Sequence, residues 1–196
     1  MDKELQSLAR DILAFWFGAP DEAGQDEPRE TWWLKDPALD AEIRARFLGP
    51  YQGAAAGEFD AMAQTAEGAL ALILLLDQFS RNMFRDEPAC YASDEAARKV
   101  AHLALDLGFD QAVSPVRRWF FYLPFEHSES LADQDLSLSL FEALPESPQR
   151  DETIASASRH REIVAQFGRF PHRNEILGRA TTAEEAAFLR QPNSSF

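Results

Sequence analysis

Apolar residues recur along this chain every three or four positions, which is the period of an α-helix with one buried face. Leu5, Leu8, Ile12 and Phe15 set this pattern at the start of the chain. Strict alternation of apolar and polar residues, which is typical of a half-buried strand, is nearly absent. The hydrophobic pattern therefore predicts an all-α protein.

Helix start and stop signals divide the chain into seven or eight helices joined by short turns. Asp36 before Pro37 predicts one helix start, and Thr182 with Glu185 predicts another as a capping box. Proline lacks a backbone N–H, so Pro50 and Pro124 are predicted helix ends. The expected helices cover about residues 5–16, 37–48, 65–84, 94–107, 115–123, 128–144 and 152–167, with a short last helix after Thr182.

Short turns between helices of this length indicate antiparallel helical hairpins. The 196 residues suit one domain, residues 1–196, with a buried core. We found no clean repeat of about 34 residues, the period of tetratricopeptide arrays. Periodicity alone therefore leaves both a bundle and a stacked array open.

The net charge of −14 narrows the classes of partner. Phosphate backbones and anionic membrane surfaces repel an acidic chain, so nucleic acid and membrane are excluded as expected partners. The longest apolar run, Ala69 to Leu76, is far below the roughly 20 residues that span a bilayer. The N-terminus lacks the pattern of a secretory signal, and Cys90 is the only cysteine. These features predict a cytoplasmic protein without an intrachain disulfide.

Three predicted helices place polar side chains on the face that their periodicity assigns to the core. Asp77 and Arg81 share a stripe with Leu70 and Leu74. Burying a polar group without a partner costs about 1–3 kcal/mol, and more for a charge. We therefore expect these side chains to bind one another, water or a ligand. They are Asp77, Arg81, Arg85, Gln134, His160 and, if the helix over 128–144 starts early, His127.

A basic segment near the C-terminus adds candidates for ligand binding. Arg169, His172, Arg173 and Asn174 follow one another closely, and Arg179 is near in sequence. Arginine matches the geometry of carboxylate and phosphate groups, so an anionic small molecule or a peptide carboxylate is the expected ligand. The alternative is that these arginines cap helix ends and balance the acidic surface.

Metal-ligating residue types are present, but their spacing matches no metal motif. Neither H-E-x-x-H nor a repeated Glu-x-x-His pair occurs among Glu126, His127, Glu129, Asp133, His160 and His172. Cys90 has no histidine nearby in sequence, and no G-x-S-x-G elbow exists. The sequence predicts no bound metal and no cofactor.

Three longer motifs carry a family resemblance. They cover residues 76–85 (LDQFSRNMFR), 122–129 (YLPFEHSE) and 168–174 (GRFPHRN), with supporting segments at 12–18 and 176–179. In this order they resemble the bacterial family known as domain of unknown function 924. Ser80 departs from the family pattern, where proline is usual. The resemblance implies a tetratricopeptide-like fold of stacked helical hairpins in a compact α-α superhelix, and it implies no established activity.

Three classes of function remain open at this point. The first is a binding domain, in which arginines hold an anion and polar neighbours orient it. The second is an enzyme, a hydrolase or transferase with His127 or His160 as base and Glu129 orienting it. The third is a structural or adaptor protein with a polar core network. The expected ligand-binding residues are Asp77, Arg81, Asn82, Arg85, His127, Gln134, His160, Arg169, His172, Arg173 and Asn174.

Overall fold

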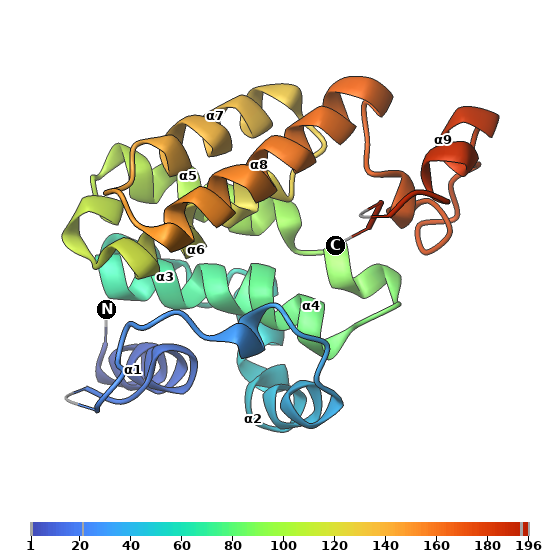
Figure 1. Ribbon diagram of the computed structural model, residues 1–196. Coiled ribbons are helices and arrows are strands. Elements are labelled where there is room, and N and C mark those ends of the chain that lie inside the picture. The colour runs from blue at the N-terminus through green and yellow to red at the C-terminus, as the bar shows by residue number, and fades with distance from the viewer. Residues whose placement is uncertain (1, 21, 193, 196) are drawn as a thin grey trace. The chain divides into compact units, whose positions relative to one another are not determined.

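Helices form the regular secondary structure of the computed structural model, which describes residues 2–20, 22–192 and 194–195 (Figure 1). No strand occurs in these ranges, so the all-α prediction is confirmed. The α-helices are α1 (Lys3–Phe17), α2 (Pro37–Ala55), α3 (Ala66–Ile73), α4 (Ser80–Met83), α5 (Asp94–Asp106), α6 (Pro115–Glu126), α7 (Leu131–Glu142), α8 (Pro148–Phe167) and α9 (Ala183–Phe188). Short 3-10 segments are η1 (Glu30–Trp32), η2 (Asp60–Gln64), η4 (Pro88–Tyr91), η5 (Asp110–Ala112) and η6 (Pro171–Arg173).

One helix changes its winding in the middle. The segment η3 (Leu74–Phe79) is π-helical and joins α3 to α4 without a break. Every residue of η3 is buried, including Asp77 and Gln78. A single wide turn of this kind is rare and occurs often at functional positions.

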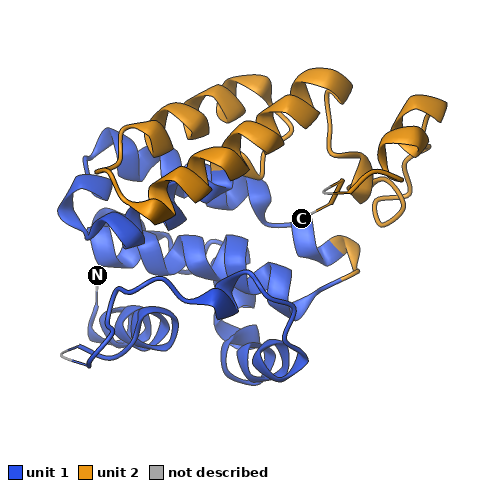
Figure 2. Ribbon diagram, viewed as in Figure 1, with its two compact units in different colours: residues 1–85, 89–124 blue, residues 86–88, 125–196 orange. Residues whose placement is uncertain are grey.

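The described chain divides into two compact units (Figure 2). Unit 1 comprises residues 1–85 and 89–124, and unit 2 comprises residues 86–88 and 125–196. The prediction of one domain over residues 1–196 is not tested by this division. The tetratricopeptide-like stacking also stays a prediction.

Unit 1 is built around the helix that runs from α3 through η3 to α4. α1 and α5 pack against α3, and α2 packs against η3 and α4. Aromatic rings fill the space beside this helix: Trp16 stacks on Trp32, and both contact the fully buried Phe120. The indole N–H of Trp32 donates to the carbonyl of Trp16 at 3.2 Å. Trp32 thereby holds the loop after α1 to the core.

Unit 2 rests on the pair of helices α7 and α8, which pack against each other (Figure 1). A second small core joins the end of α8 to the C-terminal segment. It consists of Ile163, Val164, Phe170 and Phe188, with Phe167 and Leu189 against it. The capping box predicted at Thr182 and Glu185 is present and opens α9.

The predicted helix ends at Pro50 and Pro124 are wrong. α2 continues through Pro50 to Ala55, and α6 continues through Pro124 to Glu126. In both helices the apolar stripe extends beyond the proline: Tyr51 follows Phe47 in α2, and Phe125 follows Phe121 in α6, all buried. Burial of Tyr51 and Phe125, at about 1.5–3 kcal/mol each, offsets much of the roughly 3 kcal/mol that an interior proline costs.

Two other boundaries also differ from the sequence prediction. α7 begins at Leu131, so His127 lies after α6 and not on an early turn of α7. α8 begins at Pro148, capped by the hydroxyl of Ser147, one turn before the predicted start. Within the described ranges, none of the helices has the length and hydropathy needed to cross a bilayer.

Candidate functional site

The predicted site residues fall into both units. Asp77, Arg81, Asn82 and Arg85 belong to unit 1; the members in unit 2 are His127, Gln134, His160, Arg169, His172, Arg173 and Asn174. Each group is described within its own unit.

In unit 1, Arg81 lies between two carboxylates. Its Nη1 is 3.1 Å from Oδ1 of Asp77 and 3.0 Å from Oδ1 of Asp94. Burial alone would lower the pKa of the Arg81 guanidinium, but Asp77 and Asp94 outweigh burial and raise it. Arg81 is therefore a permanent cation held by two anions.

Side chains also satisfy the carbonyls of the π-helical turn. The hydroxyl of Ser80 donates to the carbonyls of Leu76 and Asp77, both at 2.9 Å. The hydroxyl of Ser93 donates to Leu76 at 2.6 Å, and Arg81 donates to the carbonyl of Asp77 at 2.8 Å. Ser80 thus fastens the wide turn through its hydroxyl.

Arg85 and Asn82 share one partner on α2. Arg85 donates to both oxygens of Asp40, through Nε at 2.6 Å and Nη2 at 2.8 Å. Asn82 donates to Oδ1 of Asp40 at 2.7 Å. Burial alone would raise the pKa of Asp40, but the hydrogen bonds from Arg85 and Asn82 outweigh burial and lower it. These contacts attach α4 to α2.

In unit 2, Gln134 closes the C-terminal end of α6. Its Nε2 lies 2.6 Å from the carbonyl oxygen of Glu126, 2.7 Å from that of Ser128 and 3.4 Å from that of Phe125. Carbonyls only accept hydrogen bonds, so the surroundings fix the orientation of the amide. Its Oε1 is buried and has no hydrogen-bond partner among the described residues.

Glu126 and His160 form a buried pair in unit 2. Nδ1 of His160 is 3.0 Å from Oε1 of Glu126 and 2.9 Å from the carbonyl oxygen of Ser156. Because this carbonyl can only accept, Nδ1 carries a hydrogen. The hydroxyl of Ser156 donates to the same Oε1 at 2.8 Å.

The second carboxylate oxygen of Glu126, Oε2, differs from Oε1 in its hydrogen bonding. Oε2 is buried and has no hydrogen-bond partner among the described residues, and Glu126 as a whole is 2% exposed. Burial alone would raise the pKa of Glu126. The nearby His160, His127 and Ser156 outweigh burial and lower the pKa. Glu126 is thus a buried carboxylate that stays ionised.

Histidines and aromatic rings surround this pair. His127 is half-buried, and its ring centroid lies 6.4 Å from that of His160. Phe170 meets His160 edge-on at 5.6 Å and lies 5.6 Å from His172, while the guanidinium of Arg173 lies over Phe170 at 4.5 Å. Burial, followed by the charges of Arg173 and His160, lowers the pKa of His172 to about 3. His172 is therefore neutral at physiological pH.

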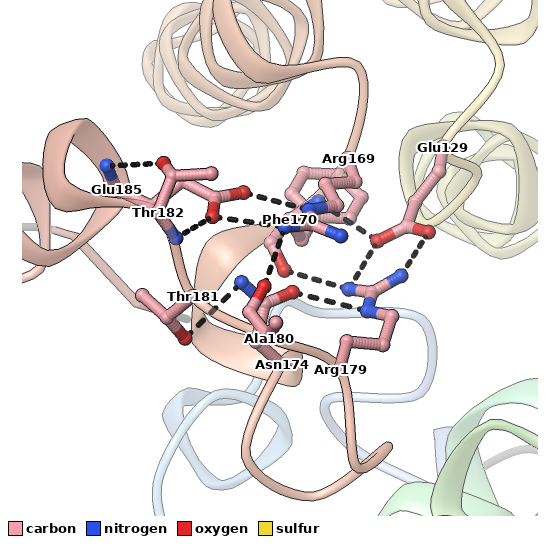
Figure 3. A network of polar contacts seen from close by, with 9 residues as sticks. All are labelled: Glu129, Arg169, Phe170, Asn174, Arg179, Ala180, Thr181, Thr182 and Glu185. Carbon is pink, nitrogen blue, oxygen red and sulfur yellow. Dashed lines mark hydrogen bonds and ion pairs between the residues drawn. The ribbon is translucent and has the colours of Figure 1, made fainter.

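A third polar network involves the C-terminal arginines (Figure 3). Arg169 donates to both oxygens of Glu185, at 2.6 and 2.9 Å. Arg179 donates to both oxygens of Glu129, at 2.7 and 3.0 Å, and also to the carbonyl of Phe170 at 3.0 Å. Asn174 is fully buried and accepts from Nε of Arg179 at 3.0 Å. These contacts fold the segment after α8 back on itself.

The expected partner of the histidine base needs correction. Glu129 accepts hydrogen bonds from Arg179 and from the backbone N–H of Phe170, at 2.8 Å for the latter. The carboxylate that contacts His160 is Glu126, which the sequence reasoning did not select for this role. A signal for Glu126 was available, because it is an acidic residue at the end of the aromatic run from Trp119 to Phe125. In the part of the chain that the structure describes, no three His, Cys, Asp or Glu side chains group as metal ligands do.

Comparison with known proteins places the chain in a family without assigning an activity. A solved structure of a protein of unknown function from Agrobacterium tumefaciens is 44% identical, with a TM-score of 0.83; the match covers 94% of this chain and 98% of that one. No curated protein matches. A model of the family described as "Bacterial protein of unknown function (DUF924)" matches residues 12–193. The chain therefore belongs to this family, as its motifs indicate.

Proposed function

We propose that the protein binds a small molecule at a cluster in unit 2 formed by Glu126, His127, Gln134, Ser156 and His160, called here the Glu126 cluster. The observation that carries the proposal is Oε2 of Glu126, which is buried, ionised and without a hydrogen bond from the described residues. Leaving a buried charged acceptor unsatisfied is expensive, and native proteins do so rarely. A ligand that donates to this oxygen removes the cost.

The ion pairs of three arginines weaken the prediction from sequence that arginines bind an anionic ligand. Arg81, Arg85 and Arg169 each form a two-point or shared ion pair with carboxylates of their own unit. An anionic ligand at these positions would have to displace Asp94, Asp40 or Glu185. At these three arginines the anion predicted from sequence therefore has to compete with intact ion pairs, whereas a hydrogen-bond donor at Glu126 does not.

Binding is tested by comparing Glu126→Gln with the wild-type protein in native mass spectrometry and in a thermal-shift screen of polar metabolites. We expect the wild-type protein to retain or bind a compound, and Glu126→Gln to lose it, because the amide removes the charge of the acceptor. Asp135→Asn is the matched control, since it makes the same chemical change at an exposed side chain paired with Arg161. Equal binding by wild-type and Glu126→Gln proteins would contradict the proposal, as would the absence of any wild-type ligand.

A catalytic role is the second candidate, and the geometry of His160 favours it. A carboxylate that holds one imidazole nitrogen in place is the arrangement that orients a general base. Here Glu126 and the Ser156 carbonyl hold Nδ1. Turnover of phosphate esters, amides or thioesters that is lost in His160→Gln would support an enzyme. Ligand binding without turnover in the same screen would leave a binding protein.

A further inference from the structure

The two side-chain oxygens without partners in the Glu126 cluster restrict the chemistry of the ligand. Oε2 of Glu126 and Oε1 of Gln134 can both accept hydrogen bonds and cannot donate. The two residues are in direct contact, because Nε2 of Gln134 donates to the backbone carbonyl of Glu126 at 2.6 Å. The cluster therefore requires a ligand that presents N–H or O–H donors, and a carboxylate or phosphate ester would place acceptor against acceptor.

The charge at this position favours a cation among the possible donors. Glu126 is ionised and 2% exposed, with a single hydrogen-bonded oxygen. Hydrogen bonds to an ionised acceptor are strongest when the donor is also charged. The net charge of −14 over the chain also raises the local concentration of cations around the protein.

The hydrogen bonds that Oε1 of Glu126 already accepts favour one kind of cation over another. Oε1 of Glu126 already accepts from the hydroxyl of Ser156 at 2.8 Å and lies 3.0 Å from Nδ1 of His160. A guanidinium or amidinium binds a carboxylate best through two parallel hydrogen bonds, one to each oxygen. Glu126 has only Oε2 to offer for such a pair. A compact ammonium group, which donates from one atom in three directions, needs only Oε2 and a neighbouring acceptor.

We infer that the ligand of the Glu126 cluster carries a primary ammonium group, which donates to Oε2 of Glu126 and to Oε1 of Gln134. This inference rests on the proposed function and adds the chemical class of the ligand. Ser156 and His160 then act as positioning residues, because they occupy Oε1 and turn Oε2 toward the ammonium group.

The test uses simple probes at matched ionic strength: n-propylammonium, guanidinium and acetate. Binding is followed through the imidazole NMR signals of His127 and His160, two members of the cluster. We expect n-propylammonium to bind wild-type protein at least tenfold more tightly than guanidinium or acetate. Glu126→Gln should weaken n-propylammonium binding at least tenfold, and Asp135→Asn should leave it unchanged.

A second variant keeps the test decisive if Glu126→Gln does not fold. Ser156→Ala removes one donor from Oε1 at an exposed residue, so it should narrow the preference for n-propylammonium over guanidinium. Tighter binding of guanidinium or acetate by the wild-type protein would overturn the ammonium class. If that binding still required Glu126, the proposed site would stand. If none of the three probes shifts the His127 or His160 signals, both the ligand class and the binding function are contradicted.

Discussion

At the scale of single residues, His172 links the stability of the protein to pH. Its pKa is about 3 in the folded protein, against 6.5 for an ordinary histidine, because of burial and then the nearby charge of Arg173. Between these two values the unfolded chain binds a proton that the folded protein does not bind. Stability from this residue is therefore complete above pH 6.5 and is lost as the pH falls toward 3.

We predict that His172→Gln makes the protein less sensitive to acid. The wild-type free energy of unfolding should fall between pH 6.5 and pH 4 with a contribution from His172 of at most about 1.4 kcal/mol per pH unit. Urea unfolding at several pH values measures this slope, which should be shallower in the variant. His102→Gln, at an exposed position of α5, is the control and should keep the wild-type slope. Equal slopes for the wild-type protein and His172→Gln would contradict this account.

Arg81 lies between two carboxylates of unit 1, so its loss should be costly for stability. Removing it leaves Asp77 and Asp94 facing each other, with Asp77 completely buried. Because a buried charge without its partner is costly, Arg81→Met should lower the free energy of unfolding by about 3–5 kcal/mol.

Urea unfolding of Arg81→Met at neutral pH measures this loss. The control is Lys99→Met, which breaks the exposed pair of Lys99 with Glu95 and should change stability by less than about 1 kcal/mol. A small effect in both variants would show that the pair around Arg81 behaves like a surface contact.

At the scale of helices, alanine should have a large effect at one helical glycine and a small effect at another. A Cβ at Gly68 in α3 would lie 2.2 Å from the carbonyl oxygen of Met62, a backbone atom that cannot move aside. A Cβ at Gly49 in α2 would meet nothing within 4 Å outside its two chain neighbours. The next residue is Pro50, whose ring crowds the Cβ of a helical residue before it. Close packing against Met62 requires the first glycine, whereas at the second only the neighbouring proline opposes a side chain.

Gly68→Ala should destabilise the protein by about 1–3 kcal/mol or more, as overpacking does. Gly49→Ala should change stability by less than about 1 kcal/mol, because crowding against Pro50 offsets the better helix propensity of alanine. Thermal and urea unfolding of the two variants measure the difference. Unchanged stability of Gly68→Ala would contradict the predicted contact at Met62.

Local signals in the sequence locate some helix boundaries correctly and miss others. Asp36 and Thr182 cap α2 and α9 as expected, since capping depends on residues three positions apart. Pro50 and Pro124 were predicted to end helices and do not. Their effect is decided by burial of side chains such as Tyr51 and Phe125, and this burial depends on distant parts of the chain.

In the candidate site, too, the sequence predicts what depends on neighbouring residues but not what depends on distant ones. Helical periodicity identifies Asp77, Gln134 and His160 as inward-facing, and all three are buried. It does not identify their partners. Asp40 holds Arg85 across 45 positions, and Glu126 approaches His160 across 34. Whether an inward polar residue is already satisfied depends on these contacts, which no sequence period encodes.

At the scale of the whole molecule, the unfolding of the two units can be measured separately, because each unit contains its own spectroscopic reporter residues. All four tryptophans, Trp16, Trp32, Trp33 and Trp119, belong to unit 1. His127, His160 and His172 belong to unit 2. Helix α6 contributes residues to both units, since the boundary falls after Pro124.

We expect the two sets of probes to report one unfolding transition, as the prediction of a single domain requires. Tryptophan fluorescence and histidine NMR signals, recorded on the same urea series, should give the same midpoint and the same slope. Midpoints that differ beyond experimental error would show that the units unfold independently, and the single-domain prediction would then be wrong.

The π-helical turn between α3 and α4 also bears on how this protein can change in evolution. A π-turn takes up one residue more than an α-turn while the helix goes once around its axis. Deleting one residue from Leu74–Phe79 would therefore restore ordinary winding and leave α4 at nearly the same angle to α3. It would narrow the turn whose carbonyls accept hydrogen bonds from Ser80 and Arg81. At this turn the helix can thus lose one residue and keep its direction, whereas a deletion in α3 would turn everything beyond it by about 100°.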